Sequence, residues 1–326
     1  MEDSLCLEEI GLLLLIDRLQ ANHQTLGRET IVPFAELKQP AVARGYAALI
    51  GVLLEKGFVR GDAEAFALTP DGSRAVRDIA QRCSLNALFY DEYYRAIRHS
   101  RAHALFCERV YGKDLGQHGM ADMQQLDRAL AELQIEPGMT LLDFGCGDGQ
   151  ISEYIADASG ALVTGVDLAG QAIRIAAERT AGKRDRIKFR CADVEKEPES
   201  LGAEMFDRVI AIDSLFFTRD QPSVTKLLLD HLTPGGRMVV FYICPPPVAE
   251  NETAFARGLS ALGQTYRVLD FSVQNKQHWL KKEAALKDLE SMFKAEGNEF
   301  LYKNRLAECG GIQDFRRFLY VVRMLN

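Results

Sequence analysis

Residues 140–149 read Thr-Leu-Leu-Asp-Phe-Gly-Cys-Gly-Asp-Gly, and this stretch decides the fold class of the 326-residue chain. The apolar run Thr140–Phe144 predicts a buried strand, and a helix is expected from Ile151. The glycines between them allow the backbone to turn tightly and to approach a ligand without a Cβ in the way. The N-terminus of the helix that follows carries partial positive charge and free N–H groups, which suit a carboxylate or phosphate.

Strands and helices alternate beyond this loop. We expect further strands at Leu162–Asp167, Ile187–Cys191, Phe206–Ile212 and Met238–Ile243, with helical residues at Gly170–Thr180 and Leu227–Leu232. A helix at Glu250–Leu262, a strand at Tyr266–Phe271, a long helical stretch from about Lys276 to Cys309 and a strand at Phe315–Met324 follow, the last two strands forming an edge pair. This alternation predicts an α/β fold with a doubly wound, mostly parallel seven-stranded sheet.

The N-terminal part has a different pattern. Helices are expected at Leu5–Leu19 and Ala41–Lys56, a β-hairpin around Gly61-Asp62, and another helix that Thr69 caps. Helix, helix, hairpin, helix is the order of a winged helix. We therefore expect a winged-helix-like domain over residues 1–84, a helical linker or cap over 85–130, and the α/β domain over 131–326.

Composition narrows the class of protein. The net charge of −7 argues against nonspecific nucleic-acid binding, which needs a basic surface. The seven cysteines form no CxxC pair, so reduced thiols in a cytoplasm are expected rather than a disulfide framework. The acidic start Met1-Glu2-Asp3 lacks the basic region of a signal peptide, and the apolar run Leu12–Ile16 is too short to span a membrane.

Two further acidic residues follow predicted strands. Asp167 ends the second strand, 22 positions after Gly145, and a carboxylate there can accept both hydroxyl protons of a ribose. Asp193 follows the third strand, where its side chain can face an adenine ring. Because carboxyl ends of parallel strands meet at one edge of a sheet, these acids and the glycine loop together predict a nucleoside site.

Five segments resemble the class I S-adenosylmethionine-dependent methyltransferases: LLDFGCGDG (141–149), VTGVDLAGQAI (163–173), IKFRCADVE (187–195), FDRVIAIDSLFF (206–217) and LTPGGRMVVF (232–241). The resemblance implies S-adenosylmethionine as cofactor. It assigns Asp143, Gly145 and Gly147 to the methionine part, Asp167 to the ribose, Leu168, Asp193 and Val194 to the adenine, and Ile212 and Asp213 to the methyl-transfer channel. Cys146, between the two glycines, is a further candidate cofactor-binding residue. A nicotinamide-dependent dehydrogenase is the nearest alternative, but its fingerprint is GxGxxG, whereas this loop reads GxGxG.

The segment YGKDLGQHGMADMQQL (111–126) resembles the helix that precedes the catalytic domain in small-molecule methyltransferases. That resemblance places Tyr111, Gln117, His118 and Gly119 near the carboxylate of the cofactor or near the acceptor, although a purely packing role is equally open. The expected activity is in-line transfer of a methyl group to an oxygen, nitrogen or carbon nucleophile of a small molecule. Where the acceptor must lose a proton, His118 and His278 are the candidate catalytic bases.

Two alternatives accompany this prediction: a scaffold that binds the cofactor without catalysis, and a nucleic-acid-linked regulator. In the second, the winged-helix-like module binds DNA while the α/β domain senses the cofactor, although the acidic charge weighs against such a regulator. The module also resembles the one that serves dimerisation in small-molecule O-methyltransferases, which makes a homodimer possible.

His99, His103 and Cys107 share one expected helical face, but positions i and i+8 lie about 12 Å apart along a helix. We therefore expect no metal site.

Overall fold

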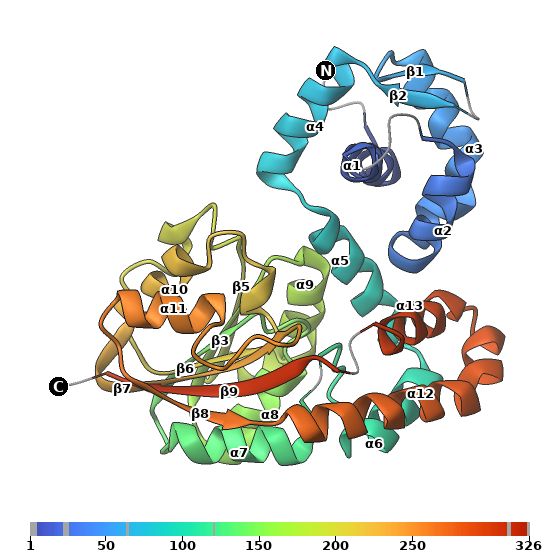
Figure 1. Ribbon diagram of the computed structural model, residues 1–326. Coiled ribbons are helices and arrows are strands. Elements are labelled where there is room, and N and C mark those ends of the chain that lie inside the picture. Colours follow the sequence, from blue (N-terminus) through green and yellow to red (C-terminus); the bar gives the residue numbers. More distant parts are fainter. Residues whose placement is uncertain (1–4, 22–25, 63–64, 120, 312–313, 325–326) are drawn as a thin grey trace. The chain divides into compact units, whose positions relative to one another are not determined.

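A seven-stranded sheet forms the centre of the C-terminal part of the chain in the computed structural model (Figure 1). The strands are β3 (Thr140–Phe144), β4 (Leu162–Asp167), β5 (Ile187–Cys191), β6 (Phe206–Ile212), β7 (Leu232–Cys244), β8 (Tyr266–Asp270) and β9 (Arg316–Arg323). They lie in the order β5–β4–β3–β6–β7–β9–β8, with β3 to β7 parallel and the pairs β7–β9 and β9–β8 antiparallel. The predicted doubly wound, mostly parallel sheet with an antiparallel edge pair is confirmed.

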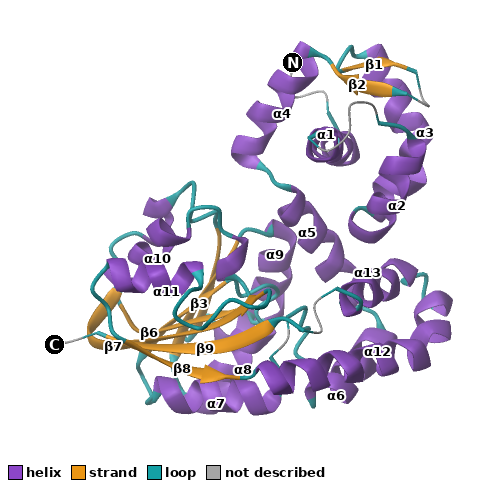
Figure 2. Cartoon of the chain, in the orientation of Figure 1, coloured by secondary structure: helices purple, strands orange, loops and turns teal. Residues whose placement is uncertain are grey.

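Helices cover both faces of this sheet (Figure 2). The helices α7 (Met123–Leu133) and α8 (Gln150–Ser159) share one apolar core with Leu141, Val163 and Ile210. The helices α10 (Gln221–Asp230) and α11 (Ala254–Ala261) share another core with Leu142 and Val209 from the opposite face. Neighbouring residues of one strand therefore enter different cores, as the alternation of side chains along a strand requires. Helix α9 (Gly170–Arg179) packs on β4 and β5.

The strand order places a ligand site at the carboxyl end of β3. The chain moves outward from β3 to β4 and β5 on one side, and from β6 to β7 on the other. Loops that leave β3 and β6 therefore diverge to opposite faces and leave a crevice between them, which is where open α/β sheets bind ligands.

Several predicted boundaries were wrong, and helix α11 begins at Ala254 instead of Glu250. Leu232 begins β7 instead of ending a helix, because it pairs with Phe206 of β6. The long helical stretch is divided into α12 (Ser272–Ala295) and α13 (Glu299–Cys309). Gly297 adopts a φ of 71° between them, a left-handed conformation that ends a helix and that glycine adopts without strain. Short 3₁₀ turns lie at Ala181–Lys183, Pro198–Leu201 and Leu215–Phe217.

The N-terminal part has its own apolar core. Its elements are α1 (Leu7–Gln20), α2 (Arg28–Lys38), α3 (Pro40–Glu55), β1 (Val59–Gly61), β2 (Phe66–Leu68), α4 (Pro70–Arg82) and α5 (Leu85–Ile97). The hairpin pairs antiparallel, and the Thr69 hydroxyl accepts a hydrogen bond from the Gly72 N–H at 3.0 Å, as the expected N-cap of α4. Helix α2 has no counterpart among the predicted elements.

The structure describes residues 5–21, 26–62, 65–119, 121–311 and 314–324 and divides into two units. The first comprises Met1–Tyr93 with Asn298–Arg305, and the second Tyr94–Gly297 with Leu306–Asn326. The start Met1-Glu2-Asp3, on which we based the expected absence of a signal peptide, lies outside the described residues. Within the described ranges, no helix combines the length and apolar character that crossing a membrane requires.

The helical segment before the sheet is interrupted. Helix α5 ends at Ile97, and α6 (Arg101–Tyr111) begins after Ser100, whose hydroxyl accepts a hydrogen bond from the His103 N–H at 3.1 Å. The exposed His99 lies in the turn between these helices. The expectation that His99, His103 and Cys107 share one helical face was therefore wrong, because a serine N-cap starts a new helix between the two histidines.

Candidate functional site

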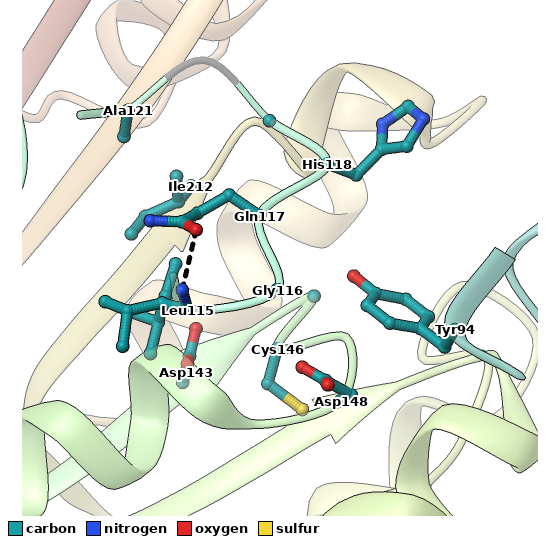
Figure 3. Close-up of a pocket in the computed structure, with 13 residues that line it drawn as sticks. Tyr94, Leu115, Gly116, Gln117, His118, Ala121, Asp143, Cys146, Asp148 and Ile212 are labelled. Carbon is teal, nitrogen blue, oxygen red and sulfur yellow. Dashed lines mark hydrogen bonds between the residues drawn. The ribbon is translucent and has the colours of Figure 1, made fainter. Parts of the chain in front are cut away.

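A small cleft lies at the carboxyl ends of β3 and β6, where the segment Leu115–Gly119 passes over the glycine loop (Figure 3). It encloses about 60 Å³. Of the residues assigned to the site from the sequence, seven line it: Gln117, His118, Gly119, Asp143, Gly145, Cys146 and Ile212. Further lining comes from Tyr94, Leu115, Gly116, Ala121, Asp148 and Ile151.

The glycine loop has the conformation that its sequence predicts. Gly145 and Gly147 adopt φ values of 77° and 57°, which side chains rarely tolerate. A Cβ on Gly145 would overlap Ser214 after β6, and a Cβ on Gly147 would overlap the Tyr94 hydroxyl. Glycine is therefore required here both by the backbone conformation and by the close approach of neighbouring side chains.

Two buried carboxyl groups flank this loop. Burial raises the pKa of Asp143 to about 6, and the nearby Asp167 raises it slightly further. The hydrogen bond that the Ser152 hydroxyl donates at 2.6 Å acts in the opposite direction and lowers this pKa. Burial likewise raises the pKa of Asp148 to about 6, although Arg179 favours the charged form. A cation that enters the cleft would favour ionisation of both groups, so the site is electrostatically prepared for positive charge.

The thiol within the glycine loop is not an activated nucleophile. Burial raises the pKa of Cys146 well above its ordinary value, and the carboxylates of Asp167, Asp143 and Asp148 raise it further. A thiol reacts as its thiolate, so a raised pKa leaves Cys146 unreactive at neutral pH. Its position supports a lining role in the cleft.

Asp167 already accepts two backbone hydrogen bonds at the end of β4. Its Oδ2 accepts from the Gly147 N–H at 2.8 Å, and its Oδ1 accepts from the Ala169 N–H at 2.9 Å. Each carboxylate oxygen can accept more than one bond, so both retain capacity for a ligand hydroxyl. Asp167 thus joins the glycine loop after β3 to the end of β4. It does not itself line the cleft of about 60 Å³.

The residues expected to hold adenine lie further along the same edge. Leu168 follows Asp167 and is half-buried, and Val194 is buried in the core beneath α10. Asp193 is half-buried and forms an ion pair with Lys196 at 3.1 Å. None of these three lines the cleft, so the structure places them beside it.

Leu115–Gly119, the segment that covers the cleft, accepts two side-chain hydrogen bonds at one of its carbonyl oxygens. The Gly119 oxygen accepts a hydrogen bond from the Tyr111 hydroxyl at 2.8 Å and another from the Lys282 ammonium of α12 at 3.1 Å. A Cβ on Gly119 would lie 2.6 Å from Asp213 Oδ2. Within the segment, the Gln117 side chain accepts from the Leu115 N–H and donates to the Lys113 carbonyl. Tyr111 and Gln117 therefore shape the segment that covers the cleft.

Asp213 adopts a strained conformation at the end of β6. Its φ is 54°, in the left-handed region that a non-glycine residue adopts at a cost. The guanidinium of Arg317 donates to both of its oxygens, at 2.5 and 3.1 Å, and also donates to Gln125 at 2.7 Å. Arg317 comes from β9, about a hundred residues later, and sequence reasoning missed it because no local pattern connects the two residues.

The two candidate bases occupy different environments. His118 lines the cleft, and its Nε2 lies 3.8 Å from Oε1 of Glu308, a residue that sequence reasoning also missed. His278 is 4 % exposed on α12, packs against Tyr111 with ring centroids 5.2 Å apart, and does not line the cleft. The geometry thus brings one of the two histidines to the site.

Comparisons with known proteins show which sequence family and which solved folds the chain resembles. The sequence family described as a methyltransferase domain matches residues 135–297, half of the chain. Phosphoethanolamine N-methyltransferase 1 of Zea mays is 30 % identical over 145 residues, which cover 44 % of this chain. The 27-O-demethylrifamycin SV methyltransferase of Amycolatopsis mediterranei is 30 % identical over 180 residues, which cover 49 % of this chain and 65 % of that protein.

The matched segment spans only 28 % of the maize enzyme. Among solved structures, Haemonchus contortus phosphoethanolamine N-methyltransferase 2, in complex with phosphomonomethylethanolamine and S-adenosylhomocysteine, superposes with a TM-score of 0.58. It covers 80 % of this chain and 62 % of that one at 15 % sequence identity. At that identity the superposition supports the fold, and the activity has to be argued from the site.

Proposed function

Because the chain belongs to the class I S-adenosylmethionine-dependent methyltransferases, we propose that it transfers a methyl group from S-adenosylmethionine to a small-molecule acceptor. The observation that carries the proposal is the cleft at the end of β3, where Gly145 and Asp143 face the segment that precedes the catalytic domain. When bound, S-adenosylmethionine supplies an electrophilic methyl group on a sulfonium.

The residues at this edge of the sheet fit the cofactor's functional groups. Gly145 and Gly147 adopt left-handed backbone conformations at the end of β3, and the absence of a Cβ lets Ser214 and Tyr94 pack directly against this loop beside the cleft. Asp143 offers a buried carboxyl for the ammonium group of the methionine part, and Asp167 offers carboxylate oxygens for the ribose hydroxyls. Leu168 and Val194 supply apolar surface for the adenine, with Asp193 at its edge.

Cofactor entry requires the covering segment to move. The cleft of about 60 Å³ is far smaller than the roughly 300–1,000 Å³ of pockets that hold ligands of this size. Leu115–Gly119 lies over it, and its Gly119 carbonyl accepts hydrogen bonds from Tyr111 and Lys282. Opening has to break these two bonds, each of which contributes about 1 kcal/mol. Once closed again, the segment excludes water from the reacting atoms.

The acceptor enters, in this proposal, beside Ile212 and Asp213 at the end of β6. The Arg317 guanidinium fixes Asp213, and Ile212 presents an apolar surface to the cleft. Alignment of the nucleophile with the methyl group supplies much of the rate. Where the acceptor must lose a proton, His118 takes it, and the Glu308 carboxylate favours the resulting imidazolium.

A transfer assay tests the proposal. The full chain is incubated with methyl-labelled S-adenosylmethionine and a panel of small amines, phenols, carboxylates and carbon acids, and labelled products are separated. Gly147→Ala should abolish transfer because its Cβ would overlap Tyr94. Gly202→Ala is the matched control, because Gly202 also has a left-handed φ, of 64°, but nothing lies within 4 Å of its Cβ. If Gly147→Ala still transfers the methyl group, the proposed site is contradicted. If the chain binds the cofactor but methylates no acceptor, a binding role is favoured instead.

We also propose that the N-terminal unit is a winged-helix-like dimerisation module of a cytoplasmic protein. The order of helices and hairpin supports this, as does the absence of a disulfide among the seven cysteines, all of which lie in the described residues. The module corresponds to residues 1–84 in the proposed division, with 85–130 as linker or cap and 131–326 as the catalytic domain. Light scattering coupled to size-exclusion chromatography should give about twice the chain's mass of 36.4 kDa. A monomeric mass at micromolar concentration would contradict the proposed dimer.

A further inference from the structure

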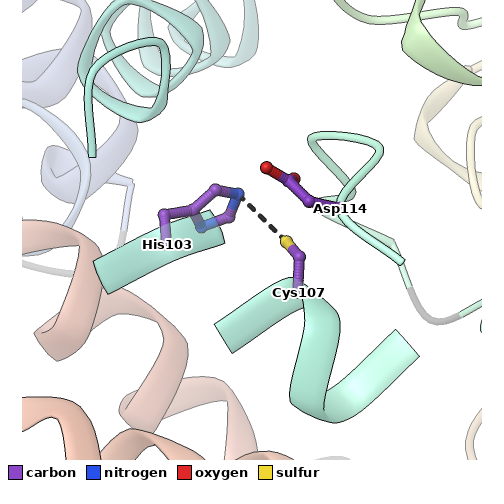
Figure 4. Close-up of side chains that lie close together, drawn as sticks. All are labelled: His103, Cys107 and Asp114. Atoms are coloured by element: carbon purple, nitrogen blue, oxygen red, sulfur yellow. Dashed lines mark hydrogen bonds between the residues drawn. The ribbon is translucent and has the colours of Figure 1, made fainter. Parts of the chain in front are cut away.

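Three side chains with metal-binding atoms gather outside the cleft (Figure 4). His103 and Cys107 lie one turn apart on α6 and are buried, and the half-buried Asp114 faces them from the turn that follows α6. Their ligand atoms all lie within 4.8 Å of one another, and His103 Nε2 is 3.3 Å from Cys107 Sγ. The helix break after Ile97 removes His99 from this group, and Asp114 takes the third position.

We propose that His103, Cys107 and Asp114 bind one zinc ion. Imidazole, thiolate and carboxylate are the ligand types of protein zinc sites. With bonds of about 2.0–2.3 Å and tetrahedral angles, neighbouring ligand atoms lie roughly 3.6 Å apart. The His103–Cys107 separation of 3.3 Å already suits this geometry. The Asp114 carboxylate has to approach by about 1 Å at most, which a side chain on a turn can do.

The charges of this group match a divalent cation. Zinc bound by one thiolate, one carboxylate and a neutral imidazole forms a complex with no net charge, so it can be buried without an uncompensated charge. On binding, the Cys107 thiol releases its proton to solvent and the sulfur forms the metal bond. Hard cations such as magnesium prefer oxygen ligands, so the sulfur and nitrogen atoms select a softer metal. A fourth position stays available to water.

The site is attached to the segment that covers the cleft. Asp114 directly precedes Leu115–Gly119, and its Oδ1 accepts a hydrogen bond from the Gly116 N–H at 3.0 Å. A metal that holds Asp114 would join the start of this segment to α6 and restrict its opening. This consequence rests on the proposed function: zinc should weaken cofactor binding, because the closed segment leaves too little room for the cofactor and the metal favours the closed segment.

Metal binding is measured first and without the cofactor. The full chain is treated with a chelator, dialysed and titrated with Co²⁺, whose thiolate bond gives a charge-transfer absorption band, and Zn²⁺ is then added to displace it. We expect one Co²⁺ per chain. Cys107→Ser should remove the band and Asp114→Asn should weaken binding at least tenfold, the loss that even outer-shell partners cause. Cys309→Ser, another buried thiol, should change neither.

Three outcomes overturn the site. The first is that the wild-type chain binds no cobalt. The second is that the charge-transfer band persists in Cys107→Ser. The third is that the band is lost when the exposed Cys6 and Cys191 are replaced by serine. If Cys107→Ser does not fold, the half-buried Asp114→Asn decides. Titration of S-adenosylmethionine with and without Zn²⁺ follows. Cobalt binding without cofactor binding would leave the metal site standing and refute the proposed function, so the two failures are distinguishable.

Discussion

The buried ion pair between Asp213 and Arg317 is the contact whose loss should destabilise the second unit most clearly. Their side chains are 4 % and 0 % exposed, and two hydrogen bonds of 2.5 and 3.1 Å join them. Replacing one partner leaves the other charge buried without compensation, which typically costs about 3–5 kcal/mol. We therefore expect Arg317→Met and Asp213→Asn each to lower the free energy of unfolding by about 3 kcal/mol or more.

Equilibrium unfolding in urea measures this loss. Trp279 is the single tryptophan of the chain, lies in α12 of the second unit and is 1 % exposed, so its fluorescence reports unfolding of that unit. An exposed pair serves as the control. Lys226 and Asp230 are 2.5 Å apart with 59 % and 55 % of their side chains exposed, and Lys226→Met should cost less than about 1 kcal/mol.

A double variant tests whether the two buried residues act together. The combination of Arg317→Met with Asp213→Asn should cost clearly less than the sum of the single losses, because the second change removes a charge that the first left unpaired. Additive losses, or single losses below about 1 kcal/mol, would refute the reasoning, since they would mean that water or another group compensates the remaining charge.

Three further predictions concern the cleft and its cover. Affinity for S-adenosylmethionine should be highest above pH 6 and should fall by up to about tenfold per pH unit below it. The reason is that Asp143, whose pKa is about 6, becomes neutral in this range. Calorimetric titrations that give a constant affinity across this range would contradict the prediction. Gly119→Ala should raise the KM for the cofactor, since its Cβ would lie 2.6 Å from Asp213 Oδ2, whereas Gly51→Ala in α3 has open space and should leave KM unchanged. Tyr111→Phe removes one of two donors to the Gly119 carbonyl and should cost about 1 kcal/mol in urea unfolding, and an unchanged midpoint would argue against this contact.

The sheet was predictable because its strands carry a local signal. The strands β3, β4, β5 and β6 have the bounds that the sequence predicts, because each is a short segment dominated by apolar and β-forming residues and lies between turn or helix signals. Helix α2 was missed because it carries Pro33 in its interior and buries only Ile31 and Ala35, so its sequence lacks a clear apolar stripe.

The cleft was predictable only where its residues are close in sequence. The glycine loop and Gln117 with His118 were found from local patterns. Arg317 and Glu308 reach the site from the far end of the chain, and nothing in their surroundings in the sequence distinguishes them from surface charges. Burial of Arg317 follows from the pairing of β9 with β7, which only the folded chain reveals.

Titration of S-adenosylmethionine into the wild-type chain and into Asp167→Ala tests the central claim most directly. Two charge-assisted hydrogen bonds to the ribose contribute about 1.5–3 kcal/mol each, so the variant should bind at least tenfold more weakly. Asp185→Ala, at an exposed turn, is the control and should bind as the wild type does. Binding to the wild type that weakens only in Asp167→Ala would support the site, whereas equal binding by both variants would place the cofactor elsewhere.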